Sequence, residues 1–190
     1  HVDGVTGDNG NNGLTRSTAL ATIQYAIDKA SNFDTILVWP GVYNEAKVPV
    51  GIHFNNKDLT VKSAADAAVI EVPNGTAVTF ANGGDVVFSN FVIRGSKIGI
   101  YAYFSDPIIN NVTVVGNTNG LIADNAEPIV TNSIFWDNTN GDLFGDPNPV
   151  TTQYSWVEDE KVNLNIFAYW KFDGDATDSA GGNNGIVYGA

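Results

Sequence analysis

The sequence predicts an all-β fold, a parallel β-helix (solenoid) with about 21 residues per turn and a capping α-helix at its N-terminal end. The main observation is a repeat of 21 residues between residues 77 and 158. Short β-branched runs fill each unit without helical periodicity between them, so each unit must stack on its neighbours to close a core. Four columns of residues recur in register: Gly99, Gly120 and Gly141; Pro107, Pro128 and Pro149; Ile108, Ile129 and Val150; and Asn90, Asn111, Asn132 and Gln153.

The capping helix is predicted over residues 18–30. Leu20, Ile23 and Ile27 recur at helical spacing, and Thr15 or Ser17 can cap the start. The end of a solenoid exposes its interior unless another element covers it. We therefore expect this helix to cover the N-terminal end of the core.

Strands follow in an irregular part and then in the regular 21-residue coils of residues 77–158. In a regular coil, a turn residue such as Gly116 or Pro107 separates three short strands. Each strand would pair with the equivalent strand of the next turn at a spacing of about 4.8 Å. We expect roughly six or seven such turns along the chain. The predicted strands are residues 35–39, 48–54, 59–62 and 69–72 in the irregular part and residues 98–104, 108–111 and 112–115 in one regular coil.

The amide column predicts an asparagine ladder formed by Asn90, Asn111, Asn132 and Gln153. Stacked amides at a corner can bond to each other and to the turn backbone, which satisfies polar groups that would otherwise be buried. A ladder residue faces inward, so Asn111 is expected to be inaccessible. The alternative is glycosylation, because residues 111–113 and 74–76 match the acceptor pattern.

Composition excludes several classes of function. The chain has 190 residues, 43% of them hydrophobic, and its net charge of −12 argues against nucleic acid as a partner. No run reaches the length of a membrane span. The absence of cysteine excludes disulfides and thiolate metal sites but leaves the compartment open.

Two segments near the N-terminus and one of the regular units carry a family resemblance. Residues 21–30 read ATIQYAIDKA and residues 34–43 read DTILVWPGVY, and the unit at residues 128–138 reads PIVTNSIFWDN. These segments resemble right-handed parallel β-helix proteins of the pectate-lyase-like superfamily, in particular the repeats of secreted bacterial surface proteins. The resemblance covers residues 1–158 and implies a right-handed coil, whereas the activities found on this fold range from lyases and hydrolases to adhesins and inert spacers.

The C-terminal residues carry a second resemblance. Residues 168–173 read AYWKFD and residues 175–185 read DATDSAGGNNG, which is similar to the start of a laminin-G-like, concanavalin-A-like domain. Residues 166–190 are too few for such a sandwich, so the chain is expected to be a piece of a longer protein with residues 159–165 as a linker. The alternative is that the tail caps the last coil of the solenoid.

Candidates for catalysis are few. Uronate lyases on this fold need a Lys or Arg base and a cation that neutralises the sugar carboxylate. The nine basic residues are scattered, and Arg94 and Lys97 form the one close pair, which is either a catalytic site or an exposed turn. The two histidines, His1 and His53, lie outside any hydrolase-like pattern.

The sequence indicates no cofactor except calcium as a candidate. Asp85, Asp106 and Glu127 occupy equivalent places in three consecutive units, with Asn148 in the fourth. Carboxylates one strand spacing apart repel each other, and Ca²⁺ would relieve that repulsion. The alternative is that each carboxylate is a solvated turn residue.

Tyr101 and Tyr103 are candidate carbohydrate-binding residues. They alternate with Ala102 on a predicted strand, so both rings share one face. The 21-residue register places Phe80 and Asn82 beside them on one side, and Ile122 and Asp124 on the other. An outward face would be a platform for sugar stacking, whereas an inward face would be core.

These observations predict a non-catalytic module of a secreted or cell-surface protein, either a structural spacer or a carbohydrate-contacting, adhesive surface. The alternative is a polysaccharide lyase or glycoside hydrolase with its site near Arg94, Lys97 and Tyr101. Expected partners are polysaccharides or cell-surface components. Self-association through the tail is a further expectation, because strand-prone runs at residues 167–172 and 185–188 could pair with a bare strand edge.

Overall fold

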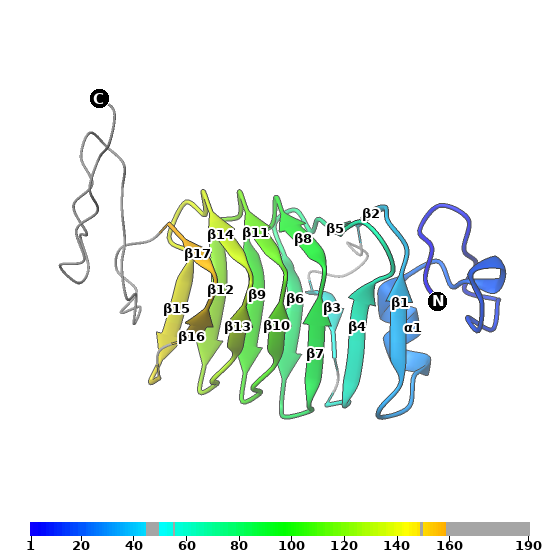
Figure 1. Cartoon of the computed structure of the whole chain (residues 1–190), viewed down its shortest axis with the longest axis horizontal. Helices are drawn as coiled ribbons and strands as arrows, with labels where there is room; N and C mark the ends of the chain where they lie inside the picture. Colours follow the sequence, from blue (N-terminus) through cyan, green and yellow to red (C-terminus); the bar gives the residue numbers. More distant parts are fainter. Residues whose placement is uncertain (45–49, 55, 149, 159–190) are drawn as a thin grey trace, which may run out of the picture.

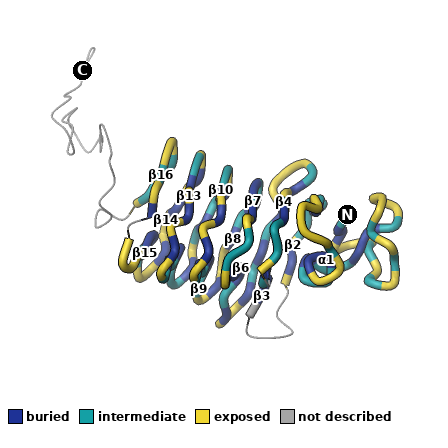
Figure 2. The backbone as a smooth tube through the Cα atoms, turned by 90° about the horizontal axis from the view of Figure 1, so that it is seen from below, coloured by how far each residue is buried: buried dark blue, intermediate teal, exposed yellow. Residues whose placement is uncertain are grey.

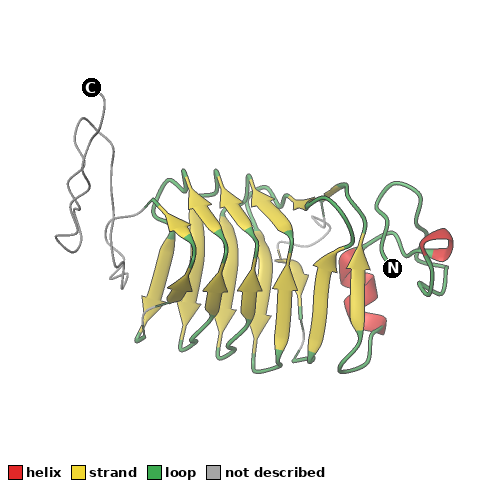
Figure 3. Cartoon of the chain, viewed as in Figure 1, coloured by secondary structure: helices red, strands yellow, loops and turns green. Residues whose placement is uncertain are grey.

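The chain forms a parallel β-solenoid in the computed structural model, which describes residues 1–44, 50–54, 56–148 and 150–158 (Figure 1). Three parallel sheets run along the long axis, and each turn contributes one strand to each sheet (Figure 3). Two sheets contain six strands and the third contains five, so the solenoid has about five turns, fewer than the expected six or seven. The predicted linker and tail, residues 159–165 and 166–190, lie outside the described residues.

Within each sheet, every strand pairs with the equivalent strand of the next turn. The first sheet consists of β1 (Thr35–Val38), β4 (Leu59–Ser63), β7 (Val86–Ser89), β10 (Ile108–Asn110), β13 (Ile129–Thr131) and β16 (Thr151–Gln153). The second sheet consists of β2 (Val42–Tyr43), β5 (Ala68–Ile70), β8 (Phe91–Arg94), β11 (Thr113–Val115), β14 (Ile134–Trp136) and β17 (Trp156–Val157). The third sheet consists of β3 (Val50–His53), β6 (Thr76–Ala81), β9 (Ile98–Tyr103), β12 (Asn119–Asp124) and β15 (Leu143–Asp146).

The predicted register holds in the middle of the solenoid and fails at both ends. Ile108 pairs with Ile129, its equivalent in the next repeat. In the last turn Leu121 pairs with Leu143, which lies one position beyond the repeat, so the predicted alignment of Gly120 with Gly141 is wrong by one position. At the other end, the interval between paired residues of β6 and β9 also exceeds the repeat by one position, and the two earlier turns are longer still.

The core is a continuous apolar column enclosed by the three sheets. Inward positions alternate with outward ones along the strands, and exposed residues gather at the turns (Figure 2). Aromatic rings fill the wider first turns: Phe54 stacks on Phe80 at 4.8 Å between ring centroids, and Phe88 stacks on Phe91 at 4.3 Å. Phe80, which the predicted register placed beside Tyr101, is therefore a core residue.

The N-terminal helix is shorter than predicted. Helix α1 (Ile23–Lys29) begins at Thr22, whose hydroxyl accepts a hydrogen bond from the Tyr25 N–H group, and a separate 3-10 helix η1 covers Arg16–Thr18. Leu20 lies between them in extended backbone, because it forms a parallel bridge with Val2. A helix over residues 18–30 would break that bridge.

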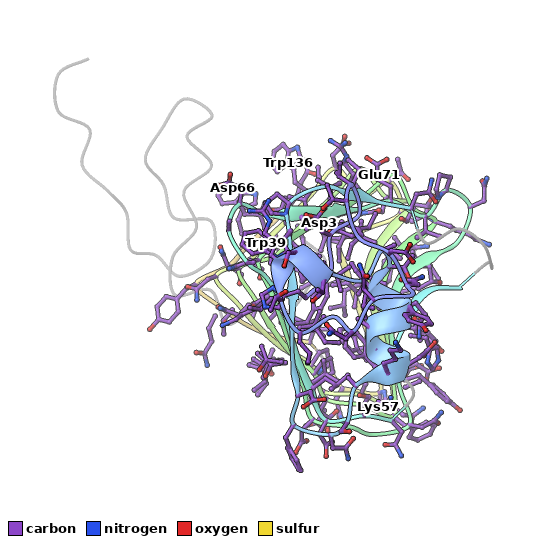
Figure 4. The ribbon with its side chains drawn as sticks, turned by 90° about the vertical axis from the view of Figure 1, so that its right-hand side faces the viewer. Asp3, Trp39, Lys57, Asp66, Glu71 and Trp136 are labelled. Atoms are coloured by element: carbon purple, nitrogen blue, oxygen red, sulfur yellow. The ribbon has the colours of Figure 1, made fainter. Side chains whose placement is uncertain are left out.

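Helix α1 covers the N-terminal end of the core, as predicted. Ile23 and Ile27 are fully buried in the same apolar cluster as the strands. Lys57 holds the end of the helix: its Nζ donates hydrogen bonds to the carbonyls of Ile27, Asp28 and Ala30 at 2.7, 2.8 and 2.7 Å. Figure 4 looks onto this end and shows Lys57 beside the last turn of α1. No helix in the described part of the chain is long and apolar enough to cross a membrane.

The predicted asparagine ladder is exposed rather than buried. Asn90, Asn111 and Asn132 adopt left-handed backbone at the corner between the first and second sheets, and Asn111 and Asn132 are not buried. Asn111 still donates a hydrogen bond to Asn90 at 2.8 Å, but the Asn132 amide donates to Asn110 at 2.9 Å and not to Asn111. The stacking prediction is therefore correct for one pair, and the inward orientation is wrong. The longer interval of the last turn places Tyr154, not Gln153, at this corner, and Gln153 pairs with Thr131.

A buried amide ladder lies at the next corner, between the second and third sheets. Asn117 and Asn138 are 2% and 7% exposed, and Ser96 begins the column. The Asn117 Oδ1 accepts the Ser96 N–H group at 3.0 Å, and the Asn138 Oδ1 accepts the Asn117 N–H group at 3.1 Å. The repeat interval separates these three positions, so the sequence contained the signal for this ladder.

Candidate functional site

The outer side of β9 displays Tyr101 and Tyr103. Ala102 between them is fully buried, so alternation along the strand directs both tyrosines outward, where each is half-buried. This resolves the alternative that the sequence left open. The two rings stack at 6.1 Å between centroids with an angle of 17° between their planes. The exposed ring of Phe104 meets the Tyr103 ring edge-on at 4.6 Å.

Cross-turn pairing extends the tyrosines into two columns. Tyr101 lies beside Ile122, which lies beside Phe144. Tyr103 lies beside Asp124, which lies beside Asp146. On the other side the neighbours are Thr79 and Ala81, not the expected Phe80 and Asn82, because the pairing of β6 with β9 is offset from the repeat by one position. We call the six outward residues the tyrosine face: Tyr101, Tyr103, Ile122, Asp124, Phe144 and Asp146.

Hydrogen bonds fix the orientation of the tyrosine face. The Tyr101 hydroxyl donates to the Asp124 Oδ2 at 3.1 Å, and the Asn125 side-chain amide donates to the other oxygen of Asp124 at 2.8 Å. Burial, and then the hydrogen bond and charge of Asp124, raise the pKa of Tyr101, so its hydroxyl remains protonated at neutral pH. The Tyr101 ring is therefore held in place before any ligand arrives, and the Tyr103 ring stacks on it.

This arrangement suits a sugar ring better than a reaction. A flat aromatic ring offers an apolar face to the C–H groups of a sugar, and carboxylate and amide groups at its edge accept and donate hydrogen bonds. Phe144 and Asp146 complete the tyrosine face but were not predicted. The 21-residue register places residues 143 and 145 beside Ile122 and Asp124, one position short of the observed partners.

The two candidate catalytic residues, Arg94 and Lys97, belong to different surfaces. Arg94 ends β8 on the outer side of the second sheet, where its guanidinium is paired with the carboxylate of Glu71. Lys97 lies in the turn before β9. Figure 4 shows Glu71, the partner of Arg94, on the same side of the solenoid as Trp136 of the second sheet. The structure therefore does not combine the two cations into one site.

Lys97 lines an open groove of about 600 Å³ at the corner between the second and third sheets. Gly95 and Gly116 adopt left-handed backbone in its wall and leave open space where a Cβ atom would project. Asp137, two turns beyond Gly95, also lines the groove. A single lysine in a groove that also contains a carboxylate does not match the paired cations that a uronate carboxylate requires.

The predicted carboxylate column is bonded by groups of the protein. The Glu127 N–H group donates to the Asp106 carboxylate at 2.6 Å, and the Asn148 amide donates to the Glu127 carboxylate at 2.6 Å. The Asp85 N–H group donates to Asp58 of the preceding turn at 2.8 Å. In residues 1–44, 50–54, 56–148 and 150–158, no group of three or more acidic or histidine side chains is placed to hold a metal ion. The geometry gives the calcium candidate no support.

Comparison of the chain with protein-family models, curated proteins and solved structures found no match. The observed solenoid agrees with the fold that the pectate-lyase-like resemblance implies, and the resemblances to that superfamily and to laminin-G-like domains stay predictions.

Proposed function

We propose that the chain is a non-catalytic β-helix module of a secreted or cell-surface protein and that the tyrosine face contacts carbohydrate. The observation that carries this proposal is the pair of outward, stacked rings of Tyr101 and Tyr103, with the Tyr101 hydroxyl bonded to Asp124. Half-exposed tyrosines on a rigid sheet lose little side-chain freedom on binding, so their contact area contributes efficiently to affinity.

The extracellular assignment rests on the two sequence resemblances, both to modules of secreted or surface proteins. The solenoid itself suits the role of a spacer. Hydrogen bonds run from turn to turn along all three sheets, and the buried amide column of Asn117 and Asn138 adds side-chain bonds at one corner. A rigid rod of this kind would display the tyrosine face at a fixed distance from whatever anchors the protein.

The alternative is a polysaccharide lyase or hydrolase. The lyase mechanism needs a base and a cationic clamp around one sugar carboxylate. Arg94 is instead paired with Glu71, and Lys97 shares its groove with Asp137. These positions favour binding without catalysis.

Binding of the protein to insoluble polysaccharides, measured as depletion from solution, tests the proposal. We expect the double variant Tyr101→Ala, Tyr103→Ala to bind about tenfold more weakly, since two stacking contacts of about 0.7 kcal/mol each are lost. Trp136→Ala is the matched control, because Trp136 is an exposed aromatic residue on the second sheet. Equal binding by both variants would contradict the assignment of the site.

A parallel incubation tests the enzymatic alternative. The protein is mixed with acidic and neutral polysaccharides, with and without calcium, and new reducing ends and unsaturated products are measured. Turnover that Arg94→Ala abolishes would overturn the non-catalytic proposal.

Self-association through the tail is part of the same proposal. Strands β15, β16 and β17 end the three sheets, and such strand edges recruit further strands. We expect deletion of residues 166–190 to change the mass in solution or the thermal stability. An unchanged, equally stable protein would show that the tail serves neither packing nor assembly.

A further inference from the structure

The second half of the solenoid has an extreme charge distribution. Residues 98–158 contain no Lys, Arg or His, and they contain seven acidic residues. This segment includes the whole tyrosine face. The acidic residues are Asp106, Asp124, Glu127, Asp137, Asp142, Asp146 and Glu158.

Two of these carboxylates belong to the tyrosine face itself. Asp124 and Asp146 are direct neighbours across β12 and β15, so their backbones lie about 4.8 Å apart. Asp146 is exposed and Asp124 is half-buried beside the Tyr101 hydroxyl. The basic residue that precedes Tyr103 most closely in the sequence is Lys97, six residues earlier. An extended strand of that length places the two residues roughly 20 Å apart.

This charge pattern restricts which carbohydrate can bind. A uronate polymer would bring its carboxylates next to Asp124 and Asp146, and like charges at such distances repel. A neutral sugar would be tolerated. A sugar with a protonated amine would gain attraction to both carboxylates.

The aromatic rings favour the same ligand. The face of a tyrosine ring attracts a cation by its quadrupole, so Tyr103, next to Asp124, can contact an ammonium group as well as the C–H face of a sugar. Ring stacking and charge attraction therefore act on one residue of the ligand.

We propose that the tyrosine face recognises polysaccharides that carry protonated amino sugars and discriminates against uronate polymers. This inference rests on the proposed carbohydrate-binding function and specifies the chemistry of the ligand. The remaining acidic residues of residues 98–158 add a long-range field that concentrates a polycationic chain on this half of the solenoid.

Titration with three oligosaccharides of equal length tests the inference: glucosamine, N-acetylglucosamine and galacturonate oligomers. We expect the glucosamine oligomer to bind at least tenfold more tightly than the acetylated one, and the galacturonate oligomer not to bind. Raising the salt concentration to about 0.5 M should weaken the glucosamine complex selectively, because exposed charges are screened over a few ångströms at that ionic strength.

Matched variants assign the effect to the site. Asp124→Asn with Asp146→Asn should weaken glucosamine binding roughly three- to tenfold and weaken binding of the acetylated oligomer less, because asparagine keeps a hydrogen-bond acceptor and removes only the charge. Asp66→Asn is the control for the loss of a carboxylate elsewhere on the solenoid, because Asp66 is exposed in the turn between β4 and β5, away from the third sheet. Far-UV circular dichroism and the urea midpoint of each variant verify that the fold is retained.

Three results would overturn the inference, and they are distinguishable. Equal binding of glucosamine and acetylated oligomers, both sensitive to Tyr101→Ala, would refute charge selection and keep the carbohydrate function. Equal binding of a lysine oligomer, insensitive to Tyr101→Ala, would reduce the effect to nonspecific charge attraction. No binding of any oligosaccharide would refute the proposed function itself.

Discussion

Asn117→Ala is the most informative test of the fold, because this side chain joins its own turn to both neighbouring turns through buried bonds. Its Oδ1 accepts the Ser96 N–H group at 3.0 Å. Its Nδ2 donates to the carbonyls of Ile93 and Val115 at 3.1 and 3.3 Å and to the Asn138 Oδ1 at 3.0 Å. Alanine removes all of these bonds without changing the backbone path, since Asn117 does not have a left-handed conformation.

The magnitude follows from what the substitution leaves behind. The Ser96 N–H group would be buried without its acceptor, which costs about 1–3 kcal/mol. The lost donor bonds and the small cavity add to this penalty, although such terms overlap, so we expect the free energy of unfolding to fall by about 2–4 kcal/mol.

Urea unfolding followed by far-UV circular dichroism measures this change, with a lower midpoint and an unchanged slope as the expected signature. Asn111→Gly is the control. Asn111 is exposed, glycine fits its φ of 54°, and a single exposed hydrogen bond to Asn90 is lost, so a change of about 0.5 kcal/mol is expected. If Asn117→Ala cost no more than Asn111→Gly, the assignment of the buried ladder to Asn117 would be refuted.

Three further predictions concern the N-terminal end of the solenoid and the close contact between backbones in its last turn. Lys57→Met should cost about 1–3 kcal/mol in urea unfolding, because three carbonyls at the end of α1 lose a charged donor, whereas Lys62→Met on the outer side of β4 should be near neutral. Burial would raise the pKa of Asp3, but backbone hydrogen bonds from the following turn and a nearby arginine outweigh it and lower that pKa. The resulting stability is therefore present above about pH 4 and lost as the pH falls through the lowered pKa, so Asp3→Asn should be destabilised relative to wild type at pH 7 and much less so at pH 3. Gly120→Ala should lower the thermal midpoint by several degrees, since its Cβ atom would lie 2.3 Å from the Asp142 carbonyl oxygen, and an unchanged midpoint would contradict the register of the last turn.

The sequence predicted the solenoid well because stacking imposes one period on many residues at once. One inserted residue makes the predicted register wrong in the C-terminal turn. The bend before β15 accommodates one extra residue, so Leu121 pairs with Leu143 and every later residue shifts by one position. A surface turn tolerates such an insertion at little cost, whereas a strand does not. The column assignments of Gly141, Val150 and Gln153 are wrong for this reason, and Ile129 pairs with Thr151 instead of Val150.

The orientation of the asparagine columns could not be deduced from spacing, because both columns have the same interval. The local corner decides between them. At Asn111 the chain turns from one strand to the next within two residues, and left-handed backbone at Asn111 leaves the side chain exposed. At Asn117 three residues form the corner, and Gly116 takes the left-handed conformation instead, so the amide folds into the interior. Glycine immediately before Ser96 and Asn117 was the signal for the buried column.

The candidate site depends on register more than on any single residue. The pairing that places Tyr101 beside Ile122 and Phe144 also places Tyr103 beside Asp124 and Asp146. One column is thus aromatic and apolar, and the other joins Tyr103 to two carboxylates. A shift of one residue would turn the whole set inward. Both columns run along the solenoid axis, so a ligand that spans three turns meets the two tyrosine rings on β9, then Ile122 and Asp124 on β12, and then Phe144 and Asp146 on β15. An extended polymer satisfies that geometry better than a single sugar, because each added residue contacts the next turn without a new loss of translational freedom. Affinity should therefore rise steeply from two to about four sugar residues and then level off, and equal affinity for the monosaccharide and the tetramer would contradict the alignment of the ligand with the solenoid axis.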